Sequence, residues 1–314
     1  KTSSSQSATS CLRIIDLLEI IHPNILALSA AFFVAVARMF YQVALGSLNP
    51  TSVTILVNVI SFATASSLYL YDGGVEKWPY QGLLWFVGVG LTGSLFGRYM
   101  SFVSQRLVGV ARTSIVMQSM LVWSTALAVL FLGEHVSLGI LTGSILIMFG
   151  GVFLVNEKGE VSKEIPLHYY LAPLLTALSF AMTFLLRRYG LAWIPSSPLG
   201  MSVSNMTALI VLGLALPFAG APKKEKDNQN VAGKKGGNGL FFAVLGGVFN
   251  ALAAMLFWTA VQMGDLVEVV PINRLSVMFV ILFSWIFFRR QELINWQVVL
   301  GGVLSVVGAF ILFV

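Results

Sequence analysis

Residues 127–152 read LAVLFLGEHVSLGILTGSILIMFGGV, and residues 285–310 read WIFFRRQELINWQVVLGGVLSVVGAF. In each stretch a glutamate is followed by glycines nine and sixteen residues later, at Glu134, Gly143 and Gly150 and at Glu292, Gly301 and Gly308. Each stretch also reads as an apolar helix, a short polar turn and a second apolar helix. Glycines at such intervals let two membrane helices approach backbone to backbone. Small residues are common in any membrane bundle, but two coincident spacings and matched glutamates favour an internal duplication.

The composition surrounding these stretches belongs to a membrane protein. Hydrophobic residues make up 57% of the chain, charged residues only 10%, and the mean hydropathy is +0.86. A soluble domain carries about 25% charged residues, so this chain cannot cover a surface that faces water. A spanning helix needs about 20 mostly apolar residues, and the apolar runs lack the alternation of membrane β-strands. Ten such runs are predicted, at 24–46, 49–71, 80–104, 109–133, 136–156, 168–190, 198–219, 239–263, 266–288 and 294–314.

The duplication divides these spans into two halves. We expect an N-terminal segment over 1–23 with an interfacial helix, a first repeat over 24–160 and a second repeat over 161–314. Five helices per repeat is an odd number, so the second repeat should be inverted relative to the first. Secondary transporters built in this way bind substrate near the midplane between the halves. The predicted fold class is therefore all-α, a polytopic membrane protein of two inverted five-helix repeats.

Several chemistries are disfavoured by what the chain contains. Cys11 is the lone cysteine, which excludes an internal disulfide and a thiolate metal cluster. The three histidines, His22, His135 and His168, fall near predicted helix ends, so we expect neither a metal site nor a cofactor. The net charge of +6 is spread over membrane loops, which suits membrane placement better than nucleic-acid binding.

One known family has a similar repeat. The runs Gly-Val-Ala-Arg at 109–112, Leu-Ala-Val-Leu-Phe-Leu-Gly-Glu at 127–134 and Leu-Thr-Gly-Ser-Ile-Leu-Ile-Met-Phe-Gly-Gly-Val at 141–152 resemble the EamA-type repeat of the drug/metabolite transporter superfamily. The region 240–314 is similar, with Arg-Gln-Glu at 290–292 standing where Leu-Gly-Glu would be. A proline common in the family's fourth span is absent, since Met-Leu-Val occupies 120–122. The resemblance implies a ten-helix transporter with a central cavity, but it implies no particular substrate.

Charged residues within spans are the first candidates for function, because each costs about 2.5–3.5 kcal/mol to insert. Arg38, Arg98 and Arg274 lie in the first, third and ninth predicted spans, which all run in the same direction. No aspartate or glutamate falls deep in any predicted span. The cavity should therefore be positively charged, and guanidinium groups offer a planar fork for carboxylate or phosphate. The alternative is that these arginines extend to the interface or fasten helix ends.

Other charged residues are assigned to the ends of spans. Arg112, Arg187 and Arg188 lie close to predicted span ends, so we interpret them as interfacial or orienting residues. Glu134 and Glu292 end predicted helices at the membrane surface. For these two carboxylates a structural role is favoured over proton coupling.

Polar and aromatic residues within spans complete the candidate site. Gln118 lies near the repeat-equivalent position of Arg274, and Asn273 adjoins Arg274. The aromatic candidates are Tyr41 in the first predicted span, Tyr99 in the third and Trp258 in the eighth. Each of these residues could equally join helices or face lipid. Three further asparagines also lie within predicted spans, namely Asn58, Asn205 and Asn250.

The resulting hypothesis is a secondary transporter that moves a small polar, anionic metabolite by alternating access. An alternative is a flippase for a phosphate-bearing lipid. A membrane-embedded enzyme is less well supported, since it would need a nucleophile, an acid/base pair or a metal at one membrane face. We expect contact with membrane lipids, a monomer or homodimer, and location in the inner (plasma) membrane of a prokaryote or in an organelle membrane. Loop charges favour both termini outside the cytoplasm, whereas members of the resembled family usually have the reverse orientation.

Overall fold

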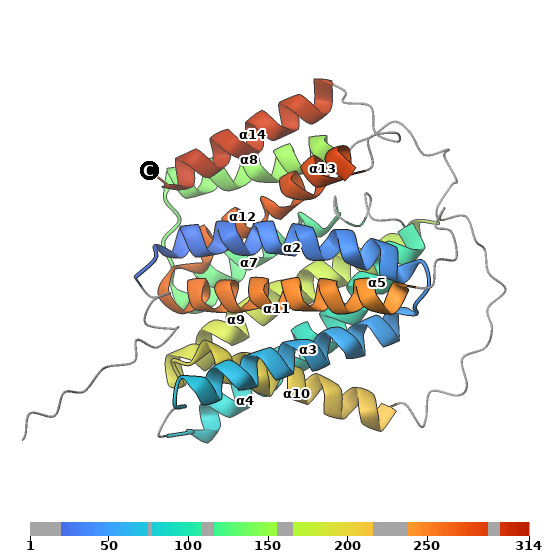
Figure 1. Ribbon diagram of the computed structural model, residues 1–314. Coiled ribbons are helices and arrows are strands. Elements are labelled where there is room, and N and C mark those ends of the chain that lie inside the picture. The colour runs from blue at the N-terminus through green and yellow to red at the C-terminus, as the bar shows by residue number, and fades with distance from the viewer. Residues whose placement is uncertain are drawn as a thin grey trace, which may run out of the picture.

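The computed structural model describes residues 20–74, 77–108, 113, 116–155, 166–215, 238–287 and 296–313. Within these ranges the regular elements are helices, which form a bundle of ten spans (Figure 1). The predicted all-α membrane fold is therefore confirmed. The predicted interfacial helix before residue 20 and the glutamate Glu292 lie outside the described residues.

The first half of the chain contributes five spans. Proline occupies the first helical position of the first two spans, where its missing N–H costs nothing and its fixed φ suits a helix. Gly133 ends the fourth span with a φ of 68°, a left-handed conformation that favours glycine. The elements are α2 (Pro23–Leu45), α3 (Pro50–Tyr71), α4 (Tyr80–Val89) with the π-helix η1 (Gly90–Gly97) and α5 (Arg98–Val108), α7 (Met120–Leu127) with the π-helix η2 (Ala128–Leu132), and α8 (Leu138–Val155).

The second half contributes five more spans in the opposite orientation. Its elements are the 3₁₀-helix η3 (Leu167–Tyr170) with α9 (Leu171–Trp193), α10 (Ser197–Ala215), α11 (Gly239–Met263), α12 (Leu266–Asn273) with α13 (Ser276–Phe287), and α14 (Trp296–Phe313). Five stretches are long and apolar enough to cross a membrane as single helices, namely Pro23–Leu45, Pro50–Tyr71, His168–Trp193, Ser197–Ala215 and Gly239–Met263. Most of the other spans are built from two or three shorter elements.

Two spans are interrupted near the middle of the bundle. In the third span, the eight residues Gly90–Gly97 are π-helical, and the Ser94 carbonyl within them accepts a hydrogen bond from Asn58 Nδ2 at 3.2 Å. The ninth span breaks between α12 and α13, just after Pro271, whose missing N–H also leaves the Val267 carbonyl without its usual helical donor. Hydrogen bonds of the 3₁₀ type, in which an N–H donates to the carbonyl three residues earlier, follow at the break, such as Leu275 N to Ile272 O at 3.0 Å. Irregular backbone at membrane depth is tolerated where it is buried in protein or lines a cavity.

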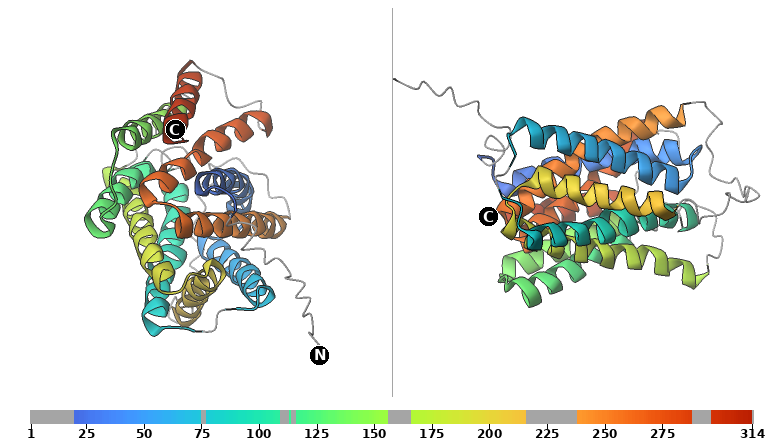
Figure 2. Two further views of the ribbon diagram at one scale, coloured as in Figure 1. Left: turned by 90° about the vertical axis from the view of Figure 1, so that its left-hand side faces the viewer. Right: turned by 90° about the horizontal axis from the view of Figure 1, so that it is seen from below.

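The helix pairs show the pseudo-two-fold relation between the halves. Helix α2 of the first half packs along α11 of the second, and α9 of the second half packs along α4 and η1 of the first (Figure 2). Helix α3 packs on its counterpart α10, and α8 packs on its counterpart α14 at one edge of the bundle. When the halves are exchanged, the α2–α11 contact becomes the contact of α9 with α4 and η1. The α3–α10 and α8–α14 contacts each become themselves.

The glycine spacing of the repeat has its explanation in the α8–α14 pair. A Cβ atom on Gly308 would lie 2.7 Å from the Gly143 carbonyl oxygen and 2.9 Å from the Leu146 Cβ. The two backbones therefore meet where the first glycine of one repeat, Gly143, lies against the second glycine of the other, Gly308. This close approach is the packing expected for helices in lipid.

Candidate functional site

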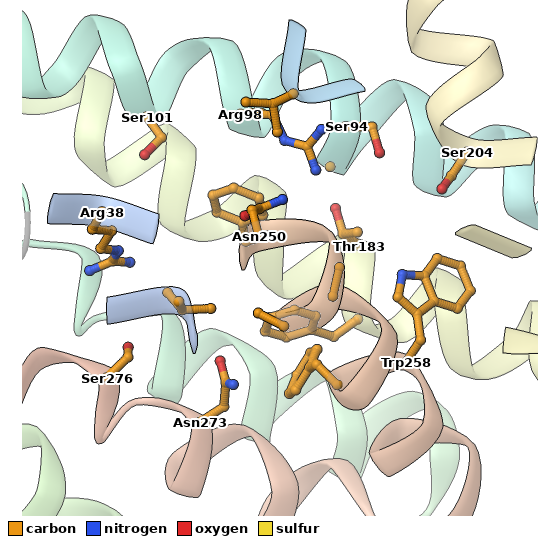
Figure 3. Close-up of a pocket in the computed structure, with 18 of the residues that line it drawn as sticks. Arg38, Ser94, Arg98, Ser101, Thr183, Ser204, Asn250, Trp258, Asn273 and Ser276 are labelled. Atoms are coloured by element: carbon orange, nitrogen blue, oxygen red, sulfur yellow. The ribbon is translucent and has the colours of Figure 1, made fainter. Parts of the chain in front are cut away.

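A cavity of about 200 Å³ lies between the two halves. Its wall includes residues of α2, α3, η1 and α5 from the first half and of α9, α10, α11 and the α12–α13 junction from the second. Figure 3 shows Arg38, Arg98 and Asn250 around this space, with Asn273 and Ser276 on the side of the α12–α13 junction. Four arginines line it, Arg38, Arg98, Arg187 and Arg274.

Arg98 is held by an amide from each half. Its Nη1 donates to Asn58 Oδ1 and, at 3.2 Å, to Asn205 Oδ1. Asn58 donates in turn to the Ser94 carbonyl, and Asn205 Nδ2 donates to the Met201 carbonyl at 2.6 Å. Asn58 and Asn205 are each the ninth residue of the symmetry-related helices α3 and α10. The pseudo-symmetry thus delivers two matched acceptors to one guanidinium, which fixes its position in the cavity wall.

Arg274 stands at the break between α12 and α13 and is 8% exposed. Its Nη2 lies 3.7 Å from the Met120 sulfur, a weak acceptor, and its Nε makes no hydrogen bond within the described part of the chain. The break is therefore what presents this guanidinium to the middle of the bundle.

Arg187 also belongs to the cavity, which corrects its interpretation as a residue at the end of a span. Helix α9 continues to Trp193, so Arg187 lies more than a turn inside the helix. Its guanidinium carbon stands 4.3 Å from the ring centroid of Trp258 and 5.3 Å from that of Phe257. Such stacking holds a cation while leaving its N–H edges available. Its Nε and Nη1 are buried, and among the described residues they have no hydrogen-bond partner.

Arg38 is half-buried on α2, and the described part of the chain provides it with no hydrogen bond or ion pair. The lining of the cavity, among described residues, includes no aspartate or glutamate. Two unit charges about 8 Å apart repel by about 2 kcal/mol at an effective dielectric constant of about 20. Four guanidinium groups around one small cavity therefore create a strongly positive site that an anion would stabilise.

The remaining sequence candidates are divided by the structure. Tyr41, Trp258 and Asn273 line the cavity, and the Tyr41 hydroxyl donates to the Gly246 carbonyl at 3.0 Å. Gln118 is 2% exposed and is not among the lining residues, although neither its Oε1 nor its Nε2 has a hydrogen-bond partner in the described chain. Tyr99 is 36% exposed and also lies outside the lining. Six of the eight sequence candidates are thus brought together around one space.

The helical spacing of residues on α9 could have predicted that Arg187 lines the cavity. Phe180, Thr183, Phe184 and Arg187 all line the cavity, and they follow the i, i+3, i+4, i+7 pattern of one helix face. An arginine that continues an inward-facing stripe is expected to face inward with it. Serine hydroxyls at the same surface, such as Ser94 and Ser101, carry no comparable signal in the sequence.

The bundle is fastened at the membrane face where α2 begins. Arg188 Nη1 donates to the carbonyls of Val261 at 2.6 Å and Gln262 at 3.0 Å, and its Nη2 lies 3.7 Å from Asp265 Oδ1. Ser197 Oγ donates to Gln262 Oε1 at 2.8 Å. These contacts tie α9 and α10 to the last turn of α11 and to Asp265 just after it, which matches the interfacial position expected for Arg188.

Glu134 at the same face joins the two halves. Its carboxylate oxygens accept from the backbone N–H groups of Leu266 at 3.1 Å and Val267 at 3.0 Å, at the start of α12. A carboxylate there caps free N–H groups and complements the helix dipole. Burial raises the pKa of the Glu134 carboxyl, and the two N–H groups act in the opposite direction. This position agrees with the structural role favoured for Glu134.

Comparisons with known proteins identify the same architecture. The sequence model of the EamA-like transporter family matches residues 23–156 and 167–314. Among 29 matching chains of solved structures, one described as a crystal structure of a protein superposes with a TM-score of 0.74. The superposition covers 93% of this chain and 98% of the other at 17% identity, which establishes the fold alone. Comparison with curated proteins finds no match.

Proposed function

We propose that this chain, which belongs to the EamA-like transporter family, is a secondary transporter that moves a small polar organic anion by alternating access. The protein is an integral membrane protein, and members of its family are transporters rather than enzymes. The charge of the cargo and the manner of its movement are the parts that we infer.

The observation that carries the proposal is the charge of the cavity. Arg38, Arg98, Arg187 and Arg274 line one space between the halves without a carboxylate among the described lining residues. Each charge costs free energy at membrane depth, so we expect each arginine there to make an interaction that offsets this cost. Fastening a helix end is one such interaction, and Arg188 makes it with bonds to the carbonyls of Val261 and Gln262. Arg38 and Arg187 make no such bonds within the described chain, which favours an anionic ligand.

The two ends of the cavity support alternating access. Toward the face where α2 ends, its wall extends to Tyr41 on α2 and to Gln105, three residues before the end of α5. At the opposite face, the Glu134 cap ties the first half to α12 of the second half, while the Arg188 contacts join helices within the second half. Rocking of one half against the other would break the Glu134 cap and expose the site to that face.

A lipid flippase remains the second candidate. The guanidinium groups could hold a phosphate head group, but a cavity walled by helices of both halves suits a water-soluble cargo better. The test of function therefore includes a lipid phosphate beside soluble anions.

The proposal is tested by flux measurements in proteoliposomes with labelled carboxylates, sugar phosphates and a lipid phosphate. Wild-type protein should move at least one soluble anion, and Arg274→Gln should lower that flux by at least about tenfold, since one lost ion contact is worth at least about 1.4 kcal/mol. Lys77→Gln, which removes a charge at an exposed loop position, should keep the wild-type flux. Wild-type flux through Arg274→Gln, or movement of the lipid phosphate alone, would refute the proposal.

A further inference from the structure

The cavity contains more positive charge than one singly charged cargo can meet. Two of its arginines, Arg38 and Arg98, come from the first half, and the other two, Arg187 and Arg274, come from the second. A single carboxylate presents one edge of two oxygens, which fits the fork of one guanidinium. Bound to one arginine, it would leave the charges contributed by the other half of the protein uncompensated.

The hydrogen-bonding state of the arginines leads to the same conclusion. Arg187 Nε and Nη1 and Arg274 Nε are buried donors without partners in the described chain. The side chains around Arg187 are the aromatic rings of Phe184, Phe257 and Trp258, which hold its charge but accept no ordinary hydrogen bond. Arg98 differs, because Asn58 and Asn205 already occupy its Nη1. Unsatisfied buried donors are costly, and they occur here on two arginines of the second half.

The first half presents a matching charge across the same space. Arg38 on α2 lines the cavity without a hydrogen bond or ion pair in the described chain. Figure 3 places Arg38 and Arg98 around the space, together with Asn250, whose Nδ2 is also without a hydrogen-bond partner in the described chain. Hydrogen-bond donors from both halves therefore surround a space whose described lining residues include no carboxylate.

We propose that the cargo is an organic anion with at least two negative charges, which arginines of the two halves bind together. This inference rests on the proposed function and names its substrate class. The shared chemistry is a dianion, and either two carboxylates or one phosphomonoester would supply it.

The test compares matched pairs of ligands that differ in one charge. Binding of succinate and its monoamide succinamate, and of glycerol 3-phosphate and its methyl phosphodiester, is measured on purified wild-type protein by ligand-induced thermal stabilisation. At least one dianion should bind at least about tenfold more tightly than its monoanionic partner, the effect of one additional ion contact. The pair that shows the preference distinguishes the dicarboxylate from the phosphate ester.

Variants connect the preference to the arginines. Arg187→Gln should bring the ratio of the two affinities toward one, and Arg38→Gln provides the same test if the first variant does not fold. Lys77→Gln should keep the wild-type ratio, because its side chain is exposed in a loop. Equal affinity for dianion and monoanion would overturn this inference and leave the proposed function standing. Failure of every anion to bind would overturn both.

Discussion

The two amides that accept hydrogen bonds from Arg98, those of Asn58 and Asn205, allow a quantitative test of the site. Asn58→Asp keeps the size of the side chain and replaces the Nδ2 that donates to Ser94 O with a second oxygen. The new carboxylate would pair with the Arg98 guanidinium that Asn58 Oδ1 already contacts. The new ion pair offsets the lost hydrogen bond of about 1 kcal/mol, so the protein should remain folded.

The effect on the cargo should be large. A carboxylate about 6 Å from a bound anion repels it by about 3 kcal/mol at an effective dielectric constant of about 20. We therefore expect Asn58→Asp to weaken anion binding by about a hundredfold, as measured by thermal stabilisation across an anion titration. Asn205→Asp changes the symmetry-related amide and should act in the same direction, because its Oδ1 also accepts from Arg98. Wild-type affinity in both folded variants would show that the cargo does not meet Arg98.

Three further changes test the fold and the gate. Glu134→Ala should lower the free energy of unfolding by about 1–2 kcal/mol through loss of the α12 cap; thermal unfolding measures this loss, and an unchanged midpoint would contradict the capping role. Gly308→Ala should destabilise by about 1–3 kcal/mol because its Cβ would sit 2.7 Å from Gly143 O, whereas Gly302→Ala, with nothing within 4 Å, should be neutral or stabilising. Equal unfolding midpoints for those two variants would refute the close approach of α8 and α14. Pro271→Ala should let the ninth span form a continuous helix and lower transport while the unfolding temperature stays the same or rises; unchanged flux would show that the break is dispensable.

The spans and the duplication could be predicted because hydropathy and spacing are local properties of the chain. Within the described residues, the ten predicted apolar runs coincide with the helices except at their ends and interruptions. The sequence predicts that Arg38, Arg98 and Arg274 lie within spans, because the apolar residues on both sides of each arginine are visible in the chain itself. The π-helical stretch before Arg98 and the outcome of the proline in the ninth span were not apparent from hydropathy.

Rotation about each helix axis was decided only by packing. Successive residues on an α-helix point about 100° apart, so neighbours of similar polarity can face opposite surroundings. Arg98 lines the cavity while Tyr99 is exposed, and Arg187 stacks on Trp258 while Arg188 bonds to the end of α11. Hydropathy averaged over a span cannot distinguish such neighbours, although the stripe that ends at Arg187 indicates the inward face of α9.

The sequence by itself determined a membrane bundle of two inverted halves with arginines at membrane depth, because lipid imposes length, apolarity and a cost for charge on each span separately. The tertiary structure decided which arginines meet around one space. That outcome depends on contacts between helices far apart in the chain, such as those of Arg98 with Asn58, 40 residues away, and with Asn205, 107 residues away.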